Sequence, residues 1–279
     1  MTARGTLVTT AELAESRDRW RVFDCRHDLV NPAIGAEQYA GAHIPGAAFA
    51  SLDRELSAPR SGTNGRHPLP DAGAFVAWLG RQGLKREDRV VCYDASGGTY
   101  ASRLWWMLRW VGHEAVAVLD GGYAKWVKEG RPVTAEVPQF APADYRGAAD
   151  PAMSVDVAYI GASLGKPGVT LLDARNAQRF AGQGETLDPV GGHIPGALNR
   201  FYTANLGADG CFKPADALRV EFSTLLGSQP ASQVVQYCGS GVSACVNLLA
   251  MEHAGLPGSR LYAGSWSEWC ASPARPVAR

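Results

Sequence analysis

The sequence carries no excess charge of either sign, because 27 lysine and arginine residues balance 27 aspartate and glutamate residues over 279 positions. A net charge of zero excludes the broad positive field with which proteins bind nucleic acid phosphates, so we expect no nucleic-acid partner. Long apolar runs are also missing. The stretch from Leu104 to Val111 is interrupted by Arg109 and falls well short of the roughly 20 residues of a membrane-spanning helix. We therefore expect no membrane association.

The amino-terminal segment has no apolar core of a secretory signal and contains acidic residues early, which favours a cytoplasmic location. No two cysteines form a C-x-x-C motif, and no nearby histidine completes a zinc pattern. We therefore expect no bound metal, and a disulfide framework is not expected in a chain of this size without a signal. The simplest interpretation is that most cysteines are small buried residues of the core. They are Cys25, Cys92, Cys211, Cys238, Cys245 and Cys270.

An internal repeat organises the chain. The first copy contains VFDCRHDLVNPAIGAEQYAGAHIPGAAF and the second LLDARNAQRFAGQGETLDPVGGHIPGALN, so a D-x-R segment precedes HIPGA in both. Two further pairs of blocks follow in the same order, which indicates a duplicated domain. The stretch between the copies is rich in proline and alanine. We expect a first domain over residues 1–136, a linker over 137–153 and a second domain over 154–279.

Each copy has the pattern of an α/β domain. The short β-branched runs Val90–Tyr93 and Val234–Tyr237 are typical of strands buried on both faces of a parallel sheet. A glycine-containing loop and a helical pattern follow each run, and Gly112 and Gly255 end these patterns. The alternation of strands and helices predicts a mainly parallel sheet with helices on both faces. Ligands of such sheets bind beyond the carboxyl ends of the strands.

The loops that begin at these carboxyl ends differ between the copies. The first begins with Asp94 and the second with Cys238, which is followed by GSGVSA. Glycines in such a loop let backbone amides turn inward, and the next helix presents its unpaired first-turn amides. Both features stabilise an anion, so the Cys238 side chain is expected to react as a thiolate. The first copy is expected to keep the fold without this chemistry, because a carboxylate cannot attack sulfur.

These blocks together resemble the two-domain rhodanese-type sulfurtransferases. The resemblance rests on the paired D-x-R and HIPGA segments, the loop CGSGVSA and the terminal YAGSWSEW, and it extends from about Leu7 to Val277. It implies tandem rhodanese-like domains in which Cys238 takes a sulfane sulfur from a small anionic donor. The persulfide then passes that sulfur to cyanide or a thiol, with a thioredoxin-like reductant as a further partner and no cofactor. The residues implied to cradle the charge are Gly239, Ser240, Gly241, Val242, Ser243 and Ala244.

The resemblance is less decisive about the donor. Family members with cations directly after the cysteine resemble thiosulfate enzymes, whereas Gly239 and Ser240 resemble the 3-mercaptopyruvate class. Arg179 matches the family arginine that meets the donor's carboxylate, a task suited to a guanidinium group. The class usually has a second arginine nearby, where this chain has Glu185 and Asp188. The residues after Cys238 lead us to expect a 3-mercaptopyruvate-type donor, and the missing second arginine keeps thiosulfate as the alternative main donor.

Other candidates have weaker support. The family has been described with a Ser–His–Asp relay, for which Ser240 and His43 would be two members, although HIPGA recurs in both copies and favours a structural turn. Trp266 follows the active half closely enough to line a pocket. The recurring D-x-R segments favour ion pairs that fix the fold. A cysteine phosphatase of the Cys-x5-Arg type is disfavoured because Ala244 stands where the arginine is needed. A non-catalytic binding module is disfavoured by the retained Cys238.

Overall fold

The computed structural model describes residues 5–279, and within them the chain divides into two compact units. Unit 1 contains the described residues up to 58, residues 70–150 and residues 207–212. Unit 2 contains residues 59–69, 151–206 and 213–279. The segment expected as a linker, residues 137–153, belongs to unit 1 up to residue 150, because it hydrogen-bonds there: Ala143 N donates to Gly80 O, and Asp150 N donates to Trp110 O.

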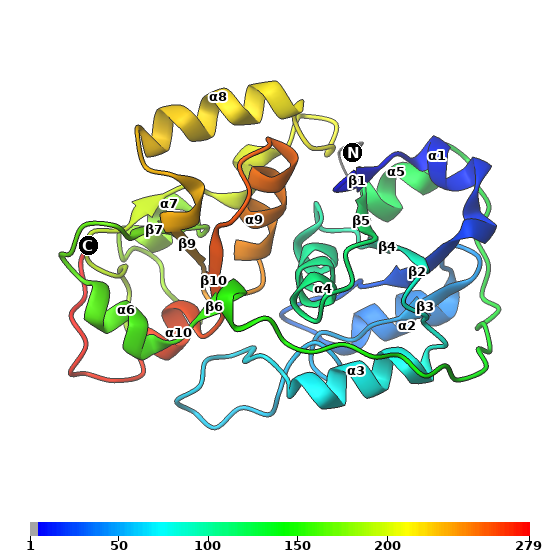
Figure 1. Ribbon diagram of the computed structural model, residues 1–279, viewed down its shortest axis with the longest axis horizontal. Coiled ribbons are helices and arrows are strands. Elements are labelled where there is room, and N and C mark those ends of the chain that lie inside the picture. Colours follow the sequence, from blue (N-terminus) through cyan, green and yellow to red (C-terminus); the bar gives the residue numbers. More distant parts are fainter. Residues whose placement is uncertain (1–4) are drawn as a thin grey trace. The chain divides into compact units, whose positions relative to one another are not determined.

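Unit 1 is built on a parallel sheet with the strand order β1-β5-β4-β2-β3 (Figure 1). Its described strands are β1 (Leu7–Val8), β2 (Trp20–Asp24), β3 (Ala47–Phe49), β4 (Arg89–Tyr93) and β5 (Val116–Leu119). Its helices are α1 (Thr10–Glu15), α2 (Ala33–Gly41), α3 (Ala72–Arg81), α4 (Thr99–Trp110) and α5 (Gly122–Lys128).

Unit 2 repeats this topology with the parallel order β6-β10-β9-β7-β8. Its described strands are β6 (Ser154–Val155), β7 (Thr170–Asp173), β8 (Leu198–Asn199), β9 (Val234–Tyr237) and β10 (Arg260–Tyr262). Its helices are α6 (Val157–Ser163), α7 (Ala177–Phe180), α8 (Ala215–Leu226), α9 (Ala244–His253) and α10 (Ser265–Trp269).

Helices cover both faces of each sheet, as the sequence predicted. Consecutive strand residues point to opposite faces, yet the four residues Val90 to Tyr93 in β4 and the four residues of β9 are all fully buried. The next elements also follow the prediction, since α4 and α9 begin a few residues after these strands. Gly112 and Gly255 adopt positive φ angles of 84° and 71° directly after the helices, as helix-ending glycines do.

The recurring D-x-R segments form buried ion pairs, which confirms their structural interpretation. Arg26 Nη2 lies 2.6 Å from Asp24 Oδ2 and also donates to the carbonyl of Ala42 at 2.7 Å. In unit 2, Arg175 Nη2 lies 2.7 Å from Asp173 Oδ2 and donates to Gly192 O at 2.7 Å. Ala42 and Gly192 each precede the HIPGA histidine. The two motifs of the repeat therefore recur together because the arginine of D-x-R donates a hydrogen bond to the backbone next to HIPGA.

One short segment of each copy belongs to the unit formed mainly by the other copy. Residues 59–69, called here the first arm, belong to unit 2, and residues 207–212 belong to unit 1. Each segment comes shortly before a long helix of its own copy, α3 in the first and α8 in the second. In unit 1, Phe212 N donates to Asp120 Oδ1 at 2.8 Å. In unit 2, Arg66 N donates to Ser267 Oγ at 3.0 Å. The first arm therefore supplies side chains to the unit that contains Cys238.

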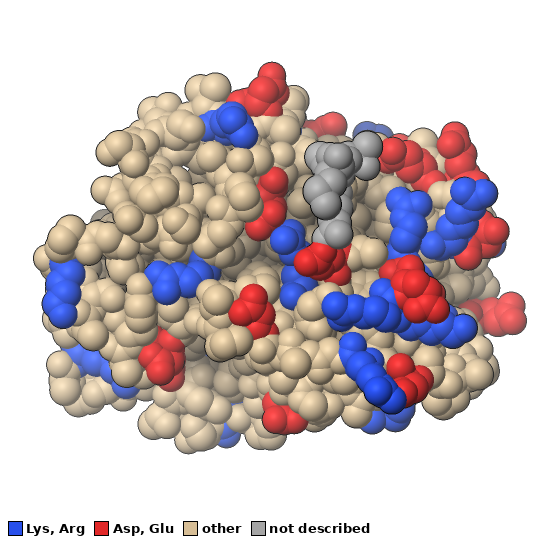
Figure 2. Space-filling model, in the orientation of Figure 1, with Lys and Arg blue, Asp and Glu red and all other residues tan. Residues whose placement is uncertain are grey.

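The surface agrees with the balanced composition. On the face drawn in Figure 2, acidic and basic side chains lie intermixed rather than gathered by sign. Among the residues that the structure describes, no helix has the length and apolar character needed to cross a membrane.

Candidate active site

Cys238 directly follows β9, at the carboxyl edge of the unit 2 sheet. Its side chain is buried, with 2% of its surface exposed. The backbone amide of Gly241 donates to Cys238 Sγ at 3.1 Å, and the amide of Ser240 reaches the same sulfur at 3.5 Å. These are the inward-turned amides that the glycine pattern predicted, and they place partial positive charge on the sulfur.

The chain segment that follows β10 holds this loop in place. Trp266 N donates to Cys238 O, and Ser267 N donates to Gly239 O, both at 2.9 Å. Gly241 adopts φ 75°, and a Cβ atom there would lie 2.3 Å from the carbonyl oxygen of Ala263. The loop therefore requires glycine at this position for two reasons, the backbone conformation and the contact.

Gly241→Ala is expected to lower turnover strongly, because the loop must shift away from Ala263 and carry the amide at Cys238 Sγ with it. Gly196→Ala is the matched control, since Gly196 has φ 80° in the same unit with open space around it. Both substitutions should cost about 1–2 kcal/mol of stability from the left-handed backbone alone. Thermal unfolding and steady-state kinetics would check this, and equal activities in the two variants would contradict it.

The equivalent loop of unit 1 holds the carboxylate of Asp94. Asp94 is 1% exposed and accepts amide hydrogen bonds from Ser96, Gly98, Tyr100 and Ala101 at 2.7 to 3.0 Å. Burial raises the pKa of Asp94, and these four amides act against that rise. The loop architecture shared by both copies is thus able to surround an anionic group with backbone donors.

Arg179 points toward the loop of Cys238 from helix α7. Asn176 caps that helix by accepting a hydrogen bond from Arg179 N at 2.8 Å. The guanidinium nitrogens Nη1 and Nη2 of Arg179 lie 3.6 and 3.7 Å from the position that a Cβ atom on Gly239 would take. The arginine selected from the sequence therefore lies beside the residue that follows Cys238.

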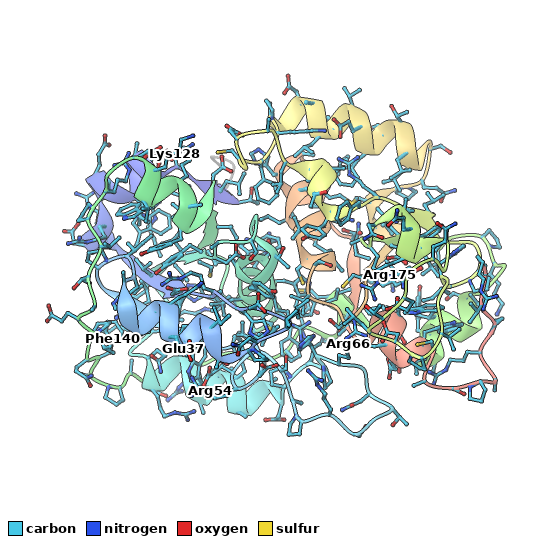
Figure 3. All side chains as sticks on the ribbon, turned by 180° about the vertical axis from the view of Figure 1, so that it is seen from behind. Glu37, Arg54, Arg66, Lys128, Phe140 and Arg175 are labelled. Atoms are coloured by element: carbon cyan, nitrogen blue, oxygen red, sulfur yellow. The ribbon has the colours of Figure 1, made fainter. Side chains whose placement is uncertain are left out.

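A second arginine, which the sequence analysis missed, lies at the same place. Arg66 comes from the first arm, and its Nη2 is 2.7 Å from the Cβ position of Gly239. Figure 3 labels Arg66 and Arg175 in the same region of unit 2. A signal for Arg66 exists in the sequence: Arg66 and His67 precede Pro68, where the second copy has Phe212 and Lys213 before Pro214.

Two carboxylates hold these guanidinium groups. Glu185 accepts from Arg179 Nε at 3.0 Å and from Arg179 Nη2 at 2.9 Å, and Asp188 accepts from Arg179 Nη2 at 3.3 Å and from Arg66 Nη1. Burial acts to raise the pKa of Glu185, but the amide of Leu187 and the Arg179 guanidinium outweigh it, so this pKa lies below its ordinary value. Glu185 is therefore held as a carboxylate.

Ser240 is bonded to His67 rather than to the histidine considered from the sequence. His67 Nδ1 lies 2.8 Å from Ser240 Oγ, and both side chains are buried. His43, in unit 1, has its ring nitrogens 2.7 and 3.1 Å from the carbonyl oxygens of Tyr39 and Glu136. The pairing of Ser240 with His43 is thus corrected to Ser240 with His67. The ring of His43 fixes its own turn instead.

The remaining candidates occupy supporting positions. Val242 and Ala244 are buried in the loop and the first turn of α9, and Ser243 is the half-buried residue before that helix. The Trp266 side chain is fully buried, and its Nε1 donates to Val190 O at 2.9 Å. Arg175 lies over its ring at 4.8 Å. Trp266 therefore packs in the core of unit 2 and touches the active loop through its backbone.

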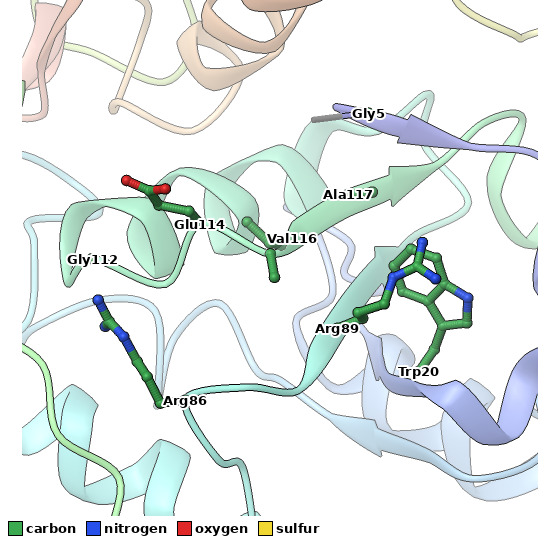
Figure 4. Close-up of a pocket in the computed structure, with 9 residues that line it drawn as sticks. Gly5, Trp20, Arg86, Arg89, Gly112, Glu114, Val116 and Ala117 are labelled. Carbon is green, nitrogen blue, oxygen red and sulfur yellow. The ribbon is translucent and has the colours of Figure 1, made fainter. Parts of the chain in front are cut away.

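Unit 1 has a cavity of about 380 Å³ that is lined by none of the residues around Cys238 (Figure 4). It is lined at the starts of β2, β4 and β5, and the guanidinium group of Arg89 lies 3.9 Å above the Trp20 ring. This is the amino edge of the sheet, opposite the edge at which parallel sheets bind ligands. Within residues 5–279 no cluster of three or more histidine, cysteine or acidic residues could hold a metal ion.

Comparisons with known proteins show which sequences and structures this chain resembles. The profile of the Rhodanese-like domain matches residues 9–129 and again residues 156–272. A Pseudomonas aeruginosa protein named "probable 3-mercaptopyruvate sulfurtransferase" is 48% identical over 98% of this chain and 97% of its own length. Thiosulfate sulfurtransferase of Gallus gallus is 36% identical over 89% of this chain and 86% of its own. The structure of 3-mercaptopyruvate sulfurtransferase from Leishmania major superimposes with a TM-score of 0.85 at 32% identity, covering 95% of this chain and 74% of that one.

Proposed function

Because this chain belongs to the rhodanese family and is a sulfurtransferase, we propose that Cys238 is the residue that carries the transferred sulfur. The observation that supports this most directly is its position: a buried cysteine at the carboxyl edge of the sheet, with two backbone amides on its sulfur. Cys238 is a free thiol. Amide donors of this kind favour the thiolate, which is the nucleophilic form.

The proposed donor is 3-mercaptopyruvate. The Cys238 thiolate attacks the sulfur of the donor and forms a sulfur–sulfur bond. The carbon–sulfur bond of the donor breaks, its electron pair stays on carbon, and the thiol proton ends on that carbon, so pyruvate leaves. The outer sulfur of the persulfide is then attacked by cyanide or a thiolate, which restores the Cys238 thiolate. Each step moves one sulfur atom and needs no external oxidant.

The Asp94 loop supports a role for the amides beyond Gly241. In unit 1 the donors to Asp94 are the second, fourth, sixth and seventh residues after it. The same positions after Cys238 are Ser240, Val242, Ala244 and Cys245. A persulfide is longer than a thiolate and reaches deeper into such a loop. The Cys245 amide already donates to Val242 O at 3.0 Å. We therefore infer that the amides of Ser240, Val242 and Ala244 stabilise the charge on the outer sulfur.

Arg66 and Arg179 supply the proposed binding site for the donor's carboxylate. Both guanidinium groups lie beside Gly239, next to the nucleophile. Arg66 would take the place of the second arginine that the 3-mercaptopyruvate class usually carries near Arg179. Planar guanidinium groups match a carboxylate with parallel hydrogen bonds. Thiosulfate remains the alternative donor, since its oxyanion end is also negatively charged.

The deciding experiment compares kcat/KM for 3-mercaptopyruvate and for thiosulfate with cyanide as acceptor. We expect the value for 3-mercaptopyruvate to be the larger. A larger value for thiosulfate would favour the alternative donor, and the absence of thiocyanate with both would overturn the assignment of Cys238 chemistry.

Arg179→Ala is expected to raise the KM for the donor, because it removes one guanidinium group from the carboxylate. The loss should correspond to about 1–3 kcal/mol of binding, or roughly 5- to 150-fold in KM. Arg146→Ala is the control, since Arg146 is exposed in unit 1 and pairs with Asp144. Steady-state kinetics check the prediction, and unchanged kinetics in Arg179→Ala would remove this residue from the site.

We further propose that unit 1 is not catalytic, because its equivalent loop begins with the buried Asp94 where the loop of unit 2 begins with Cys238. The proposed acceptors are cyanide or a thiol, with a thioredoxin-like reductant as the protein partner. The proposed location is the cytoplasm, where the six cysteines, all free thiols, would remain reduced.

A further inference from the structure

One carboxylate of this chain already lies between the two arginines beside the nucleophile. Asp188 accepts from Arg66 through Oδ1 and from Arg179 Nη2 through Oδ2 at 3.3 Å. Its side chain is 2% exposed, whereas each arginine is 21% exposed. A carboxylate ligand would bind the same way, with one carboxylate bridging the two guanidinium groups.

The charges of this cluster cancel. Arg66 and Arg179 contribute two positive charges, and Glu185 and Asp188 contribute two negative ones within hydrogen-bonding distance. Arg175 also lies 3.8 Å from Glu185, but the carboxylate of Asp173 balances its charge. An anionic donor that approaches the intact cluster therefore meets no net positive charge there. Since like charges brought together at a buried contact are costly, a donor carboxylate gains both guanidinium groups only if a carboxylate of the protein gives them up.

We infer that Asp188 is a specificity-determining residue that competes with the donor's carboxylate for Arg66 and Arg179. The inference rests on the proposed function of these arginines as the donor site. In this role Asp188 weakens the binding of every anion. A ligand with a carboxylate can take over the hydrogen bonds that Asp188 accepts from Arg66 and Arg179. It also disfavours a doubly charged donor such as thiosulfate more than a singly charged one, because repulsion grows with the charge.

Glu185 has a different role, although it carries the same charge in the same cluster. It binds the Nε edge of Arg179 and also accepts from the amides of Leu187 and Asp188 at 2.9 and 3.2 Å. Glu185 thus orients both the arginine and its own loop, and it is a positioning residue. The chain therefore offers a matched pair of substitutions, Asp188→Asn and Glu185→Gln, that each remove one negative charge.

The test uses the full-length protein and two measurements. The first is the dissociation constant of pyruvate, a carboxylate without transferable sulfur, measured by titration calorimetry. We expect Asp188→Asn to bind pyruvate about tenfold more tightly than the wild type, as expected for the loss of one competing charge. The second is kcat/KM for both donors. In Asp188→Asn it should rise more for thiosulfate than for 3-mercaptopyruvate, whereas Glu185→Gln should bind pyruvate no better than the wild type.

Two outcomes would overturn the inference. Weaker pyruvate binding in Asp188→Asn would mean that Asp188 only positions the arginines. Equal tightening in both variants would mean that the general charge of the cluster, and not a bridging carboxylate, controls binding. Either result leaves the proposed function standing, because that proposal is tested separately by turnover of the wild type and by loss of the nucleophile.

Discussion

Cys238→Ser is expected to abolish sulfur transfer, with a fall in kcat of at least about 10³-fold. The serine hydroxyl cannot form a persulfide, and the two amides at Cys238 Sγ would face an uncharged oxygen. The change is nearly isosteric at a position that is 2% exposed, so thermal unfolding should change little. Thiocyanate formation measures the activity. Mass spectrometry after exposure to the donor should find an added sulfur atom on Cys238 in the wild type only.

The matched control is Cys211→Ser, in unit 1. Cys211 is also buried and accepts a hydrogen bond from Lys125 Nζ at 3.2 Å, and a serine could accept the same bond. Its activity should equal that of the wild type. Persistent thiocyanate formation in Cys238→Ser, with normal activity in the control, would refute the assignment of Cys238 as sulfur carrier.

Asp173→Ala is expected to destabilise unit 2 by about 3–5 kcal/mol, because the buried guanidinium group of Arg175 loses its hydrogen-bonded carboxylate and keeps only the carboxylate of Glu185, 3.8 Å away. Arg175 is 3% exposed, and its Nη2 and Nε both bond the Asp173 carboxylate. Arg175 also lies over Trp266, whose backbone amide donates to Cys238 O. Turnover should therefore fall together with stability. Hydrogen exchange of the β9 amides measures the loss within unit 2.

Asp24→Ala supplies the comparison, since Asp24 makes the same ion pair with Arg26 in unit 1. It should expose the β4 amides to exchange and leave the protection of β9 unchanged. The double change Asp173→Ala with Arg175→Met should recover part of the lost stability, since no charge then remains unpaired. If the double variant is as unstable as the sum of its single changes, an unpaired buried charge is not the cause.

Local pattern was sufficient to predict the framework of the fold. The runs of β4 and β9 are apolar at consecutive positions because both faces of the sheet are covered, and this leaves a direct trace in the sequence. Gly112 and Gly255 end their helices through positive φ angles, which few other residues adopt. The duplication then doubled each signal, so Cys238 became visible through its contrast with Asp94.

The rest of the site depends on contacts between distant parts of the chain. His67 bonds Ser240 across 173 residues, and Arg66 bonds Ser267 across 201. Nothing in the periodicity of the first arm predicts such partners, since its position is set by what it packs against. The choice of His43 followed the repeated motif, but repetition in both copies marks what the fold needs. Residues that serve one reaction are expected where the copies differ, and Arg66 and His67 lie at such positions.

Because the first arm belongs to unit 2, the proposed donor site includes residues that lie outside the second copy of the repeat. A chain reduced to residues 151–279 would keep Cys238, Arg179 and Asp188, yet it would lack Arg66 and His67, which the gene encodes more than eighty residues upstream. On the proposed function, the first copy thus carries residues that serve the chemistry of the second. Under the proposed function, separating the two copies would therefore divide the donor site between two chains.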